Sequence, residues 1–233
     1  MLRRTFDPSL WQQVPRDHWQ SPRDFRRRQL VTLAFVLVGA VVLGVSLRIA
    51  PGSSAFVPFT LGLAAVWAVG AFASGPLHLG RIDAGEVLRR PVVQPILLGL
   101  GLAVVFVVGG LLVHRLGFLD VLDHQVQGVL AHADQGSAWL LLLVTVVNGV
   151  AEELFFRGAV YAAIPHRPVL WTTVVYTIAT LATGNVMLVF AAVLVGAVVA
   201  LQRRASGGIL APMLTHVTWS VLMLYALPAI FLG

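Results

Sequence analysis

The sequence predicts an all-α membrane protein, a polytopic transmembrane helix bundle of about seven spans plus one interfacial amphipathic helix. Of its 233 residues, 58% are hydrophobic and only 11% are charged, which is not the composition of a soluble domain. The apolar residues gather in runs of about 20, the length that a helix needs to cross the hydrocarbon core. The net charge of +6 does not indicate a nucleic-acid partner, because the arginines lie at the ends of these runs.

Turns that contain proline, glycine or arginine separate the predicted spans. The seven spans are Leu30–Ala50, Ala55–Ser74, Val93–His114, Ser137–Phe156, Val169–Thr183, Val186–Leu201 and Ile209–Leu232. Between the third and the fourth, Phe118–Ala133 has apolar residues at helical spacing among acids and histidines, a pattern typical of an amphipathic helix at the interface. Its two histidines, His124 and His132, are expected to be exposed rather than to bind a metal.

The arginines predict how the chain is organised and oriented. Residues 1–28 form an arginine-rich segment that we expect to be a cytoplasmic tail on anionic headgroups, followed by a membrane-embedded domain over residues 29–233. If the N-terminus is cytoplasmic, most other arginines also fall on the cytoplasmic side, with Arg48 and Arg115 as exceptions. We therefore predict a multi-pass protein of the cell membrane whose N-terminus is cytoplasmic and whose C-terminus lies outside.

Two adjacent carboxylates, Glu152 and Glu153, lie near the end of the fourth predicted span. An ionisable residue inside a membrane costs roughly 2.5–3.5 kcal/mol on insertion scales, so two of them indicate a specific role. Glu153 and Arg157 are four residues apart with the acid first, which predicts an ion pair on one helix face. Glu152 points about 100° away from that face. The sequence thus predicts one paired carboxylate and one left free for chemistry; a structural cluster that fixes helix packing is the alternative.

Two further polar sets lie in the predicted spans. The fifth span has a stripe of hydroxyls three or four residues apart, most of which we expect to serve helix packing. This stripe consists of Thr173, Tyr176, Thr177, Thr180 and Thr183. In the last span His216 and Ser220 share one face, and His216 and Glu152 are both predicted to lie roughly 7–11 Å deep, at about 1.5 Å per residue. Thr180 lies deeper and would meet them only in a bent or unevenly inserted bundle.

These residues favour hydrolysis by an activated water molecule. The chain has no cysteine, which excludes a thiol nucleophile, a disulfide and a zinc site with Cys ligands. Glu152 could act as general base, while His216 and a neighbouring hydroxyl could donate to a developing oxyanion. Zinc is a weaker option, because a catalytic zinc site needs three protein ligands. The cofactor is left open between no metal and a divalent metal held by Glu152 and His216.

Three short motifs resemble those of the CPBP family, the CAAX proteases and bacteriocin-processing proteins also called the Abi family. AEELFFRG, at residues 151–158, resembles the family's EExxxR motif. HVTWS, at residues 216–220, resembles its HxxxN motif, and a glycine-rich turn precedes it as in the family. YTIAT, at residues 176–180, lies where the family has FxxxH. The resemblance covers roughly Ser137–Leu224.

The resemblance implies an intramembrane endopeptidase like those that trim prenylated CAAX tails. By position, Glu152 corresponds to the water-activating glutamate, Glu153 and Arg157 to its supporting pair, and His216 to a histidine on the oxyanion side. Two positions depart from the family, with Thr180 in place of His and Ser220 in place of Asn, while Tyr176 in place of Phe is a mild change. Threonine can hold a water molecule but cannot take its proton near neutral pH.

We therefore predict a membrane-embedded endopeptidase whose site opens towards the cytoplasm and whose substrate is a peptide or a membrane-protein tail, lipidated or not. The alternative is a catalytically silent relative that acts as a membrane scaffold or as an immunity-type partner; the departures at Thr180 and Ser220 favour it. A small proton-coupled transporter is a third reading, but the sequence has no internal repeat of the kind that such folds contain.

Overall fold

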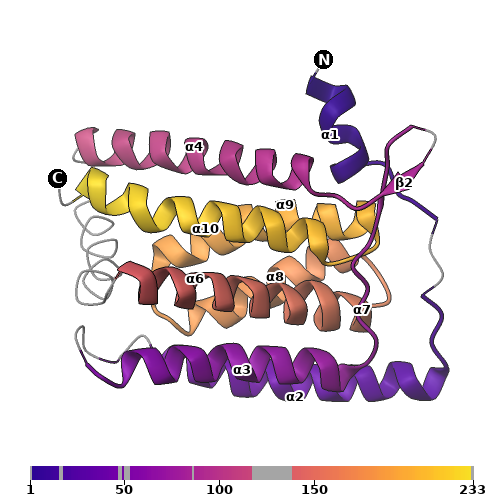
Figure 1. Ribbon diagram of the computed structural model, residues 1–233. Helices are drawn as coiled ribbons and strands as arrows, with labels where there is room; N and C mark the ends of the chain where they lie inside the picture. Colours follow the sequence, from indigo (N-terminus) through magenta and orange to yellow (C-terminus); the bar gives the residue numbers. More distant parts are fainter. Residues whose placement is uncertain are drawn as a thin grey trace.

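A computed structural model of the chain describes residues 2–15, 18–46, 49, 53–85, 87–116 and 138–231. These residues form a bundle of helices that run nearly parallel or antiparallel to one another (Figure 1). Six helices are long and apolar enough to cross a membrane, and Pro168–Leu181 is a shorter apolar helix. The predicted all-α, multi-pass fold is therefore confirmed. The predicted interfacial helix Phe118–Ala133 lies outside the described residues.

The membrane helices follow one another along the chain as the hydropathy predicts. They are α2 (Pro22–Ser46), α3 (Phe56–Ser74), α4 (Val93–Leu116), α6 (Ala138–Glu152) with its continuations η1 (Glu153–Val160) and α7 (Tyr161–Ala163), α8 (Pro168–Leu181), α9 (Val186–Ser206) and α10 (Leu210–Phe231). A short helix, α1 (Leu2–Leu10), precedes them. In the loop between α3 and α4, β1 (Ile82–Asp83) pairs antiparallel with β2 (Leu88–Arg89), with Ile82 opposite Arg89.

Several helices extend beyond the apolar runs of the sequence. α2 begins at Pro22, because Ser21 caps it: the Ser21 hydroxyl accepts a hydrogen bond from the Asp24 amide at 3.1 Å and donates one to the Asp24 carboxylate at 2.6 Å. The fourth span continues through the acidic motif to Ala163. α9 ends only at Ser206, and the following Gly207 has a φ of 69°, the left-handed conformation that favours glycine after a helix end.

The N-terminal segment is attached to the end of the bundle that carries the arginine-rich loops. α1 packs against α9 and α4. The Val14 amide donates a hydrogen bond to the Ala205 carbonyl at 3.2 Å, and Gln12 donates to Asp83 at 2.8 Å. The rings of His18 and His78 stack with centroids 3.8 Å apart. The segment predicted as a tail lying on headgroups thus makes specific contacts with the folded domain.

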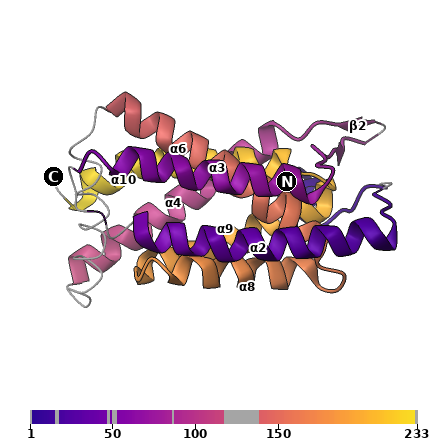
Figure 2. The same ribbon diagram turned by 90° about the horizontal axis from the view of Figure 1, so that it is seen from below.

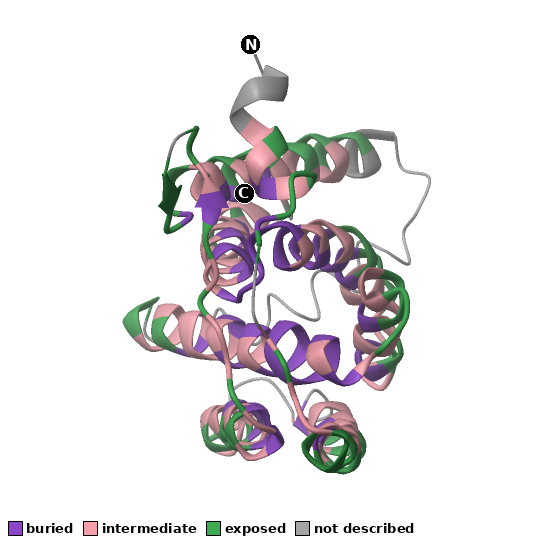
Figure 3. Cartoon of the chain, turned by 90° about the vertical axis from the view of Figure 1, so that its right-hand side faces the viewer, coloured by how far each residue is buried: buried purple, intermediate pink, exposed green. Residues whose placement is uncertain are grey.

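Pairs of neighbouring helices build the bundle around one apolar core. α10 packs against α4, α8 against α9 and α2 against α3, while α6 lies between α3 and α10 (Figures 1 and 2). At the core, the Trp67 ring stacks on Phe155 at a centroid distance of 4.7 Å. A side chain at Gly39 of α2 would overlap the Trp67 ring, so glycine is required there. The view along the helices shows buried residues on inward-facing sides and exposed residues outside (Figure 3).

The turn between α9 and α10 is hydrogen-bonded to the loop after α3. The Ile209 amide donates to the His78 carbonyl at 2.9 Å, and the Arg81 amide donates to the Ser206 carbonyl at 2.8 Å. The two segments approach so closely that a side chain at Gly80 or at Gly208 would overlap the backbone of the other segment. This contact fixes the start of α10 and therefore the position of His216 farther along the same helix.

Candidate functional site

The acidic motif occupies a junction where the fourth span changes from an α-helix to a π-helix. η1 begins at Glu153, directly after the last residue of α6, Glu152. π-helices are rare and are frequently found at functional sites. Every residue of η1 except Leu154 is buried, and Phe155 and Phe156 of this segment pack against Trp67. Because these residues are apolar on nearly all sides, the hydropathy pattern carried no signal of the wider helix.

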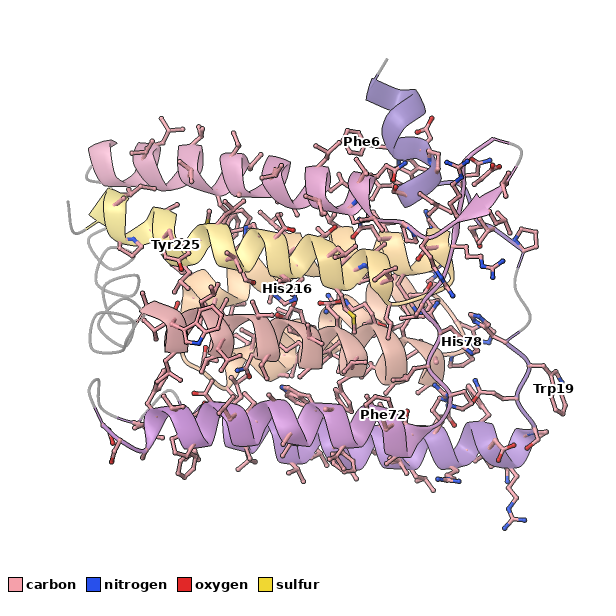
Figure 4. All side chains as sticks on the ribbon, in the orientation of Figure 1. Phe6, Trp19, Phe72, His78, His216 and Tyr225 are labelled. Carbon is pink, nitrogen blue, oxygen red and sulfur yellow. The ribbon has the colours of Figure 1, made fainter. Side chains whose placement is uncertain are left out.

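Glu153 is a completely buried carboxylate that binds two side chains. The Arg157 Nη1 donates to Glu153 Oε1 at 2.9 Å, which confirms the predicted ion pair, and neither side chain is exposed to solvent. The Nδ1 atom of His216 lies 2.8 Å from the same Oε1 atom. His216 projects from α10 into the middle of the bundle (Figure 4). Glu153 therefore joins the fourth span to the last one through an acid–imidazole contact.

The backbone of α9 and the ring of Tyr176 also support Arg157. Its Nη2 donates to the Gly196 carbonyl at 3.1 Å, and its guanidinium lies over the Tyr176 ring at 4.7 Å from the centroid. A Cβ at Gly196 would lie 3.3 Å from this guanidinium and 3.2 Å from the Tyr176 ring. Arg203, which is buried, donates from Nε to the Arg157 carbonyl at 2.7 Å.

Glu152 differs from the prediction that it is left free. Its Oε2 accepts a hydrogen bond of 2.7 Å from the Tyr176 hydroxyl on α8. The imidazole of His216, which the sequence brought to a matching depth, makes its hydrogen bond with Glu153 and not with Glu152. The 100° between adjacent residues explains this division, because it directs Glu153 towards α10 and α9 and Glu152 towards α8. The site therefore has two arms, a Glu153–Arg157–His216 cluster and a Glu152–Tyr176 pair.

The two arms carry balanced charge. When both glutamates are ionised, Arg157 contributes one positive charge and a protonated His216 contributes the second. Burying an isolated charge in an apolar interior is very costly, whereas paired and hydrogen-bonded charges are tolerated. In this balanced state, two acids and two bases cost less to bury than the same groups would without partners.

Both arms face one cavity of about 180 Å³ inside the bundle. Glu152, Tyr176, Thr180, Thr183 and His216 supply polar groups to its lining. The rest of its lining is mostly apolar and includes Leu43, Trp67, Phe156, Ala179, Leu188, Ala191, Ala192, Val195 and Trp219. A cavity of this volume with several polar groups has ample room for water molecules.

The lining continues in a direction that the sequence did not predict. From Glu152 and His216 it runs to Thr183 and Leu188, at the turn between α8 and α9. That turn lies at the opposite end of the bundle from Arg167 before α8 and from Arg203 and Arg204 in the last turn of α9. Among the described residues, the cavity thus extends away from the arginine-rich end, whereas we expected it to open towards that end.

The two positions that depart from the family motifs lie differently. Thr180 lines the cavity, but its hydroxyl donates to the Tyr176 carbonyl at 2.9 Å, so its proton is directed back to its own helix. Ser220 is partly buried and is not among the residues that line the cavity. The rest of the hydroxyl stripe is divided as well: Thr173 donates to the Val169 carbonyl, whereas Thr183 lines the cavity.

Three features of the site were missed at the sequence level. Tyr176 was placed in the hydroxyl stripe, where its position one turn before Thr180 on the same face was the available signal of a contact with the site. Arg203 is one of the arginines at the ends of the apolar runs, and no sequence pattern distinguishes it from its neighbours. Trp67, an aromatic wall of the cavity, lies in a run that is apolar throughout, so periodicity could not assign it to the cavity.

The described residues contain no group of three or more His, Cys, Asp or Glu side chains that could hold a metal ion. Glu153 is already engaged by Arg157 and His216, which leaves Glu152 and His216 as the acid and imidazole on the cavity. Two such groups are fewer than the three protein ligands of a catalytic zinc site. The function proposed below therefore has no step through a metal.

Comparison with known proteins identifies the part of the chain that holds this site. Residues 134–222 match the family model of the type II CAAX prenyl endopeptidases that is described as Rce1-like. This segment is similar to the Rce1-like family. The match includes both arms of the site and confirms the resemblance to CAAX proteases that the motifs predicted. Neither the curated proteins nor the solved structures contain a match to the chain. The Rce1-like segment thus supports a membrane endopeptidase as the kind of protein.

Proposed function

We propose that the protein is an intramembrane endopeptidase of the CAAX-prenyl-protease type in which Glu152 activates the attacking water. The observation that carries this proposal is that Glu152 and His216 line the same cavity while Glu153, which touches both His216 and Arg157, lies buried behind them. A general base and an oxyanion donor that line one cavity are the two groups that peptide hydrolysis by water requires.

The residues divide the reaction between them. A water molecule in the cavity loses a proton to Glu152 as its oxygen attacks the peptide carbonyl carbon. The Nε2–H of a protonated His216, whose Nδ1 is held by Glu153, donates to the oxygen that becomes negative. The proton on Glu152 then passes to the peptide nitrogen as the C–N bond breaks, so that a carboxylic acid and an amine leave. Thr180 can accept a hydrogen bond from the water, since its own proton is directed to Tyr176.

The mostly apolar lining suits a substrate with apolar side chains, such as the tail of a membrane protein or a lipidated peptide. We place the protein in the cell membrane with its N-terminus on the cytoplasmic side, because the arginine-rich segments gather at that end of the bundle.

A catalytically silent scaffold or immunity-type partner is the second candidate. The observation that favours it is the state of the two departing positions: Thr180 has no imidazole to exchange protons, and Ser220 does not line the cavity. In that case the charged cluster would serve only to hold the helices together.

The two functions predict different termini of membrane proteins in the cell. The gene would be deleted in its host and restored as wild type or as Glu152→Gln, and the termini of membrane proteins would be compared by mass spectrometry. New termini that appear with the wild type and vanish with Glu152→Gln support the peptidase and identify its substrate. Identical termini at equal protein levels support the silent scaffold. A purified preparation that cleaves an S-farnesylated CAAX peptide only with Glu152 intact would give the same answer directly.

A further inference from the structure

The contact between Tyr176 and Glu152 has no counterpart in the family motif, which has phenylalanine at this position. The phenol oxygen lies 2.7 Å from Glu152 Oε2, a short hydrogen bond of the charge-assisted kind. A phenylalanine ring could fill the same space but could not make this bond. The hydroxyl is therefore a specific feature of this chain, and it touches the carboxylate to which the proposed function assigns the activation of water.

The Tyr176 ring is held from two sides. The Arg157 guanidinium lies over its face at 4.7 Å from the centroid, and the Phe156 ring meets it in an edge-to-face arrangement at 4.7 Å. Gly196 of α9 lies so close that an added Cβ would be 3.2 Å from the ring. A phenol fixed in this way presents its hydroxyl in one direction, which is what an effective preorganised donor requires.

Thr180 cannot supply this contact, although it lies one turn later on the same face of α8. Its hydroxyl proton is given to the Tyr176 carbonyl, as noted above. Of the polar side chains of α8 that line the cavity, Tyr176 alone has a hydrogen bond to Glu152 among the described residues. Relative to the family pattern, the polar group of this helix that serves the site has thus moved by one turn, from position 180 to position 176.

We propose that Tyr176 is a positioning residue that holds Oε2 of Glu152 and thereby leaves Oε1 for a water molecule in the cavity. The inference rests on the proposed function for its catalytic consequence, but not for the contact itself. With Oε2 occupied, the carboxylate has one orientation and one basic oxygen directed to water. The Tyr176 hydroxyl would in this way partly replace the polar contact that is lost from the site because position 180 is not histidine.

Tyr176→Phe tests this proposal because it removes only the hydroxyl. Tyr225→Phe, the same change at an exposed tyrosine of α10, is the matched control. The first readout needs no substrate: the purified full chain is treated with dicyclohexylcarbodiimide, which attacks protonated carboxyl groups in apolar surroundings, and labelling of Glu152 is followed by mass spectrometry. The Tyr176 hydroxyl occupies Oε2 of Glu152, so its loss should leave this oxygen open to the reagent and speed labelling about tenfold.

The second readout is hydrolysis of the S-farnesylated CAAX peptide. Tyr176→Phe should lower kcat about ten- to hundredfold with little change in KM, because it disorders the base and leaves the apolar walls intact. Tyr225→Phe should change neither labelling nor kcat. Unchanged labelling of Glu152 in Tyr176→Phe overturns the proposal, even if the rate falls.

The outcomes also separate the two proposals. If the wild type shows no Glu152-dependent cleavage, the proposed function fails, while the labelling still decides whether Tyr176 holds Glu152. If Tyr176→Phe does not fold, 3,5-difluorotyrosine at position 176 takes its place: a stronger donor of nearly the same shape should slow the labelling. Labelling at the wild-type rate would then overturn the proposal.

Discussion

The two adjacent glutamates have very different surroundings. Glu153 is completely buried and shares one oxygen between Arg157 and His216, each of which has further contacts. Glu152 lines a cavity and, within the part of the chain that the structure describes, has a side-chain hydrogen bond with Tyr176 alone. The first arrangement resists change because several groups would lose their partner together. The second leaves an oxygen beside a space where water or a substrate can enter. The comparison shows how one helix can carry a structural carboxylate and a chemical one in consecutive positions.

The largest effect should come from removing the structural carboxylate. Glu153→Ala leaves Arg157 buried without its counter-ion, so we expect a loss of about 3–5 kcal/mol in the free energy of unfolding. Glu152→Ala removes one hydrogen bond at the edge of a cavity and should cost about 1 kcal/mol. Thermal unfolding and the yield of monodisperse protein in detergent measure both. Equal losses in the two variants would mean that the two carboxylates are not divided in this way.

A smaller loss of stability should follow from adding a methyl group at Gly196, where the two arms meet. Gly196 lies against both the Arg157 guanidinium and the Tyr176 ring. Alanine normally stabilises a helix relative to glycine by about 1 kcal/mol, but here its methyl group must displace one of these neighbours. We expect Gly196→Ala to be about 1–3 kcal/mol less stable than Gly101→Ala, since Gly101 has open space around it. Similar melting temperatures for the two variants would show that α9 can move away from the site.

Placing the histidine of the family pattern at position 180 should raise the catalytic rate without changing the stability that the Glu153 cluster provides. Thr180 lines the cavity beside Glu152 and Tyr176, so Thr180→His would place a proton acceptor there. We expect a roughly tenfold higher rate of peptide hydrolysis, at the low end of the range for general acid–base groups. The melting temperature should change little. An unchanged or lower rate in well-folded protein would indicate that the site has been rebuilt around Tyr176.

The smallest effect on stability should come from His78, which lies outside the site. Its dependence on pH serves as a control for the comparison of the two glutamates. Burial lowers the pKa of His78, and the positive charges of Arg203 and Arg28 lower it further. A neutral histidine of this kind stabilises the fold above its unfolded pKa of about 6.5, and this contribution is lost as the pH falls through the folded value. Between about pH 6.5 and pH 5, the wild type should therefore lose slightly more thermal stability than His78→Gln. Parallel losses would assign the acid sensitivity to other groups.

Most of the fold could be predicted from the sequence, because a membrane imposes length and polarity on each helix. The spans, their order and the short fifth helix followed from apolar runs and their breaks. The start of α2 at Pro22 was missed, although Ser21 and Asp24 form a capping pair that sequence can suggest. The attachment of the N-terminal segment through Val14 could not be predicted, since it depends on a backbone carbonyl of α9.

The site was only partly predictable. The ion pair of Glu153 and Arg157 follows from a spacing of four residues, which the π-helix preserves as a contact. Which carboxylate meets His216 depends on rotations of a few tens of degrees between packed helices, and those are set by contacts such as Gly196 with Tyr176. The direction of the cavity depends on the walls that α9 and α2 contribute, and neither helix carries a polar motif that would indicate it.

The placement of Arg157 on the same helix as Glu153 also matters while the chain is being made. His216 follows Glu153 by 63 residues in the sequence, and at about 5–20 residues per second it is synthesised roughly 3–13 s later. During that interval the fourth span has to enter the bilayer without its imidazole partner and without the Gly196 carbonyl. A cation four residues away travels with the acid from the beginning. The ion pair thus allows the helix that carries both glutamates to be inserted before the rest of its binding partners exist.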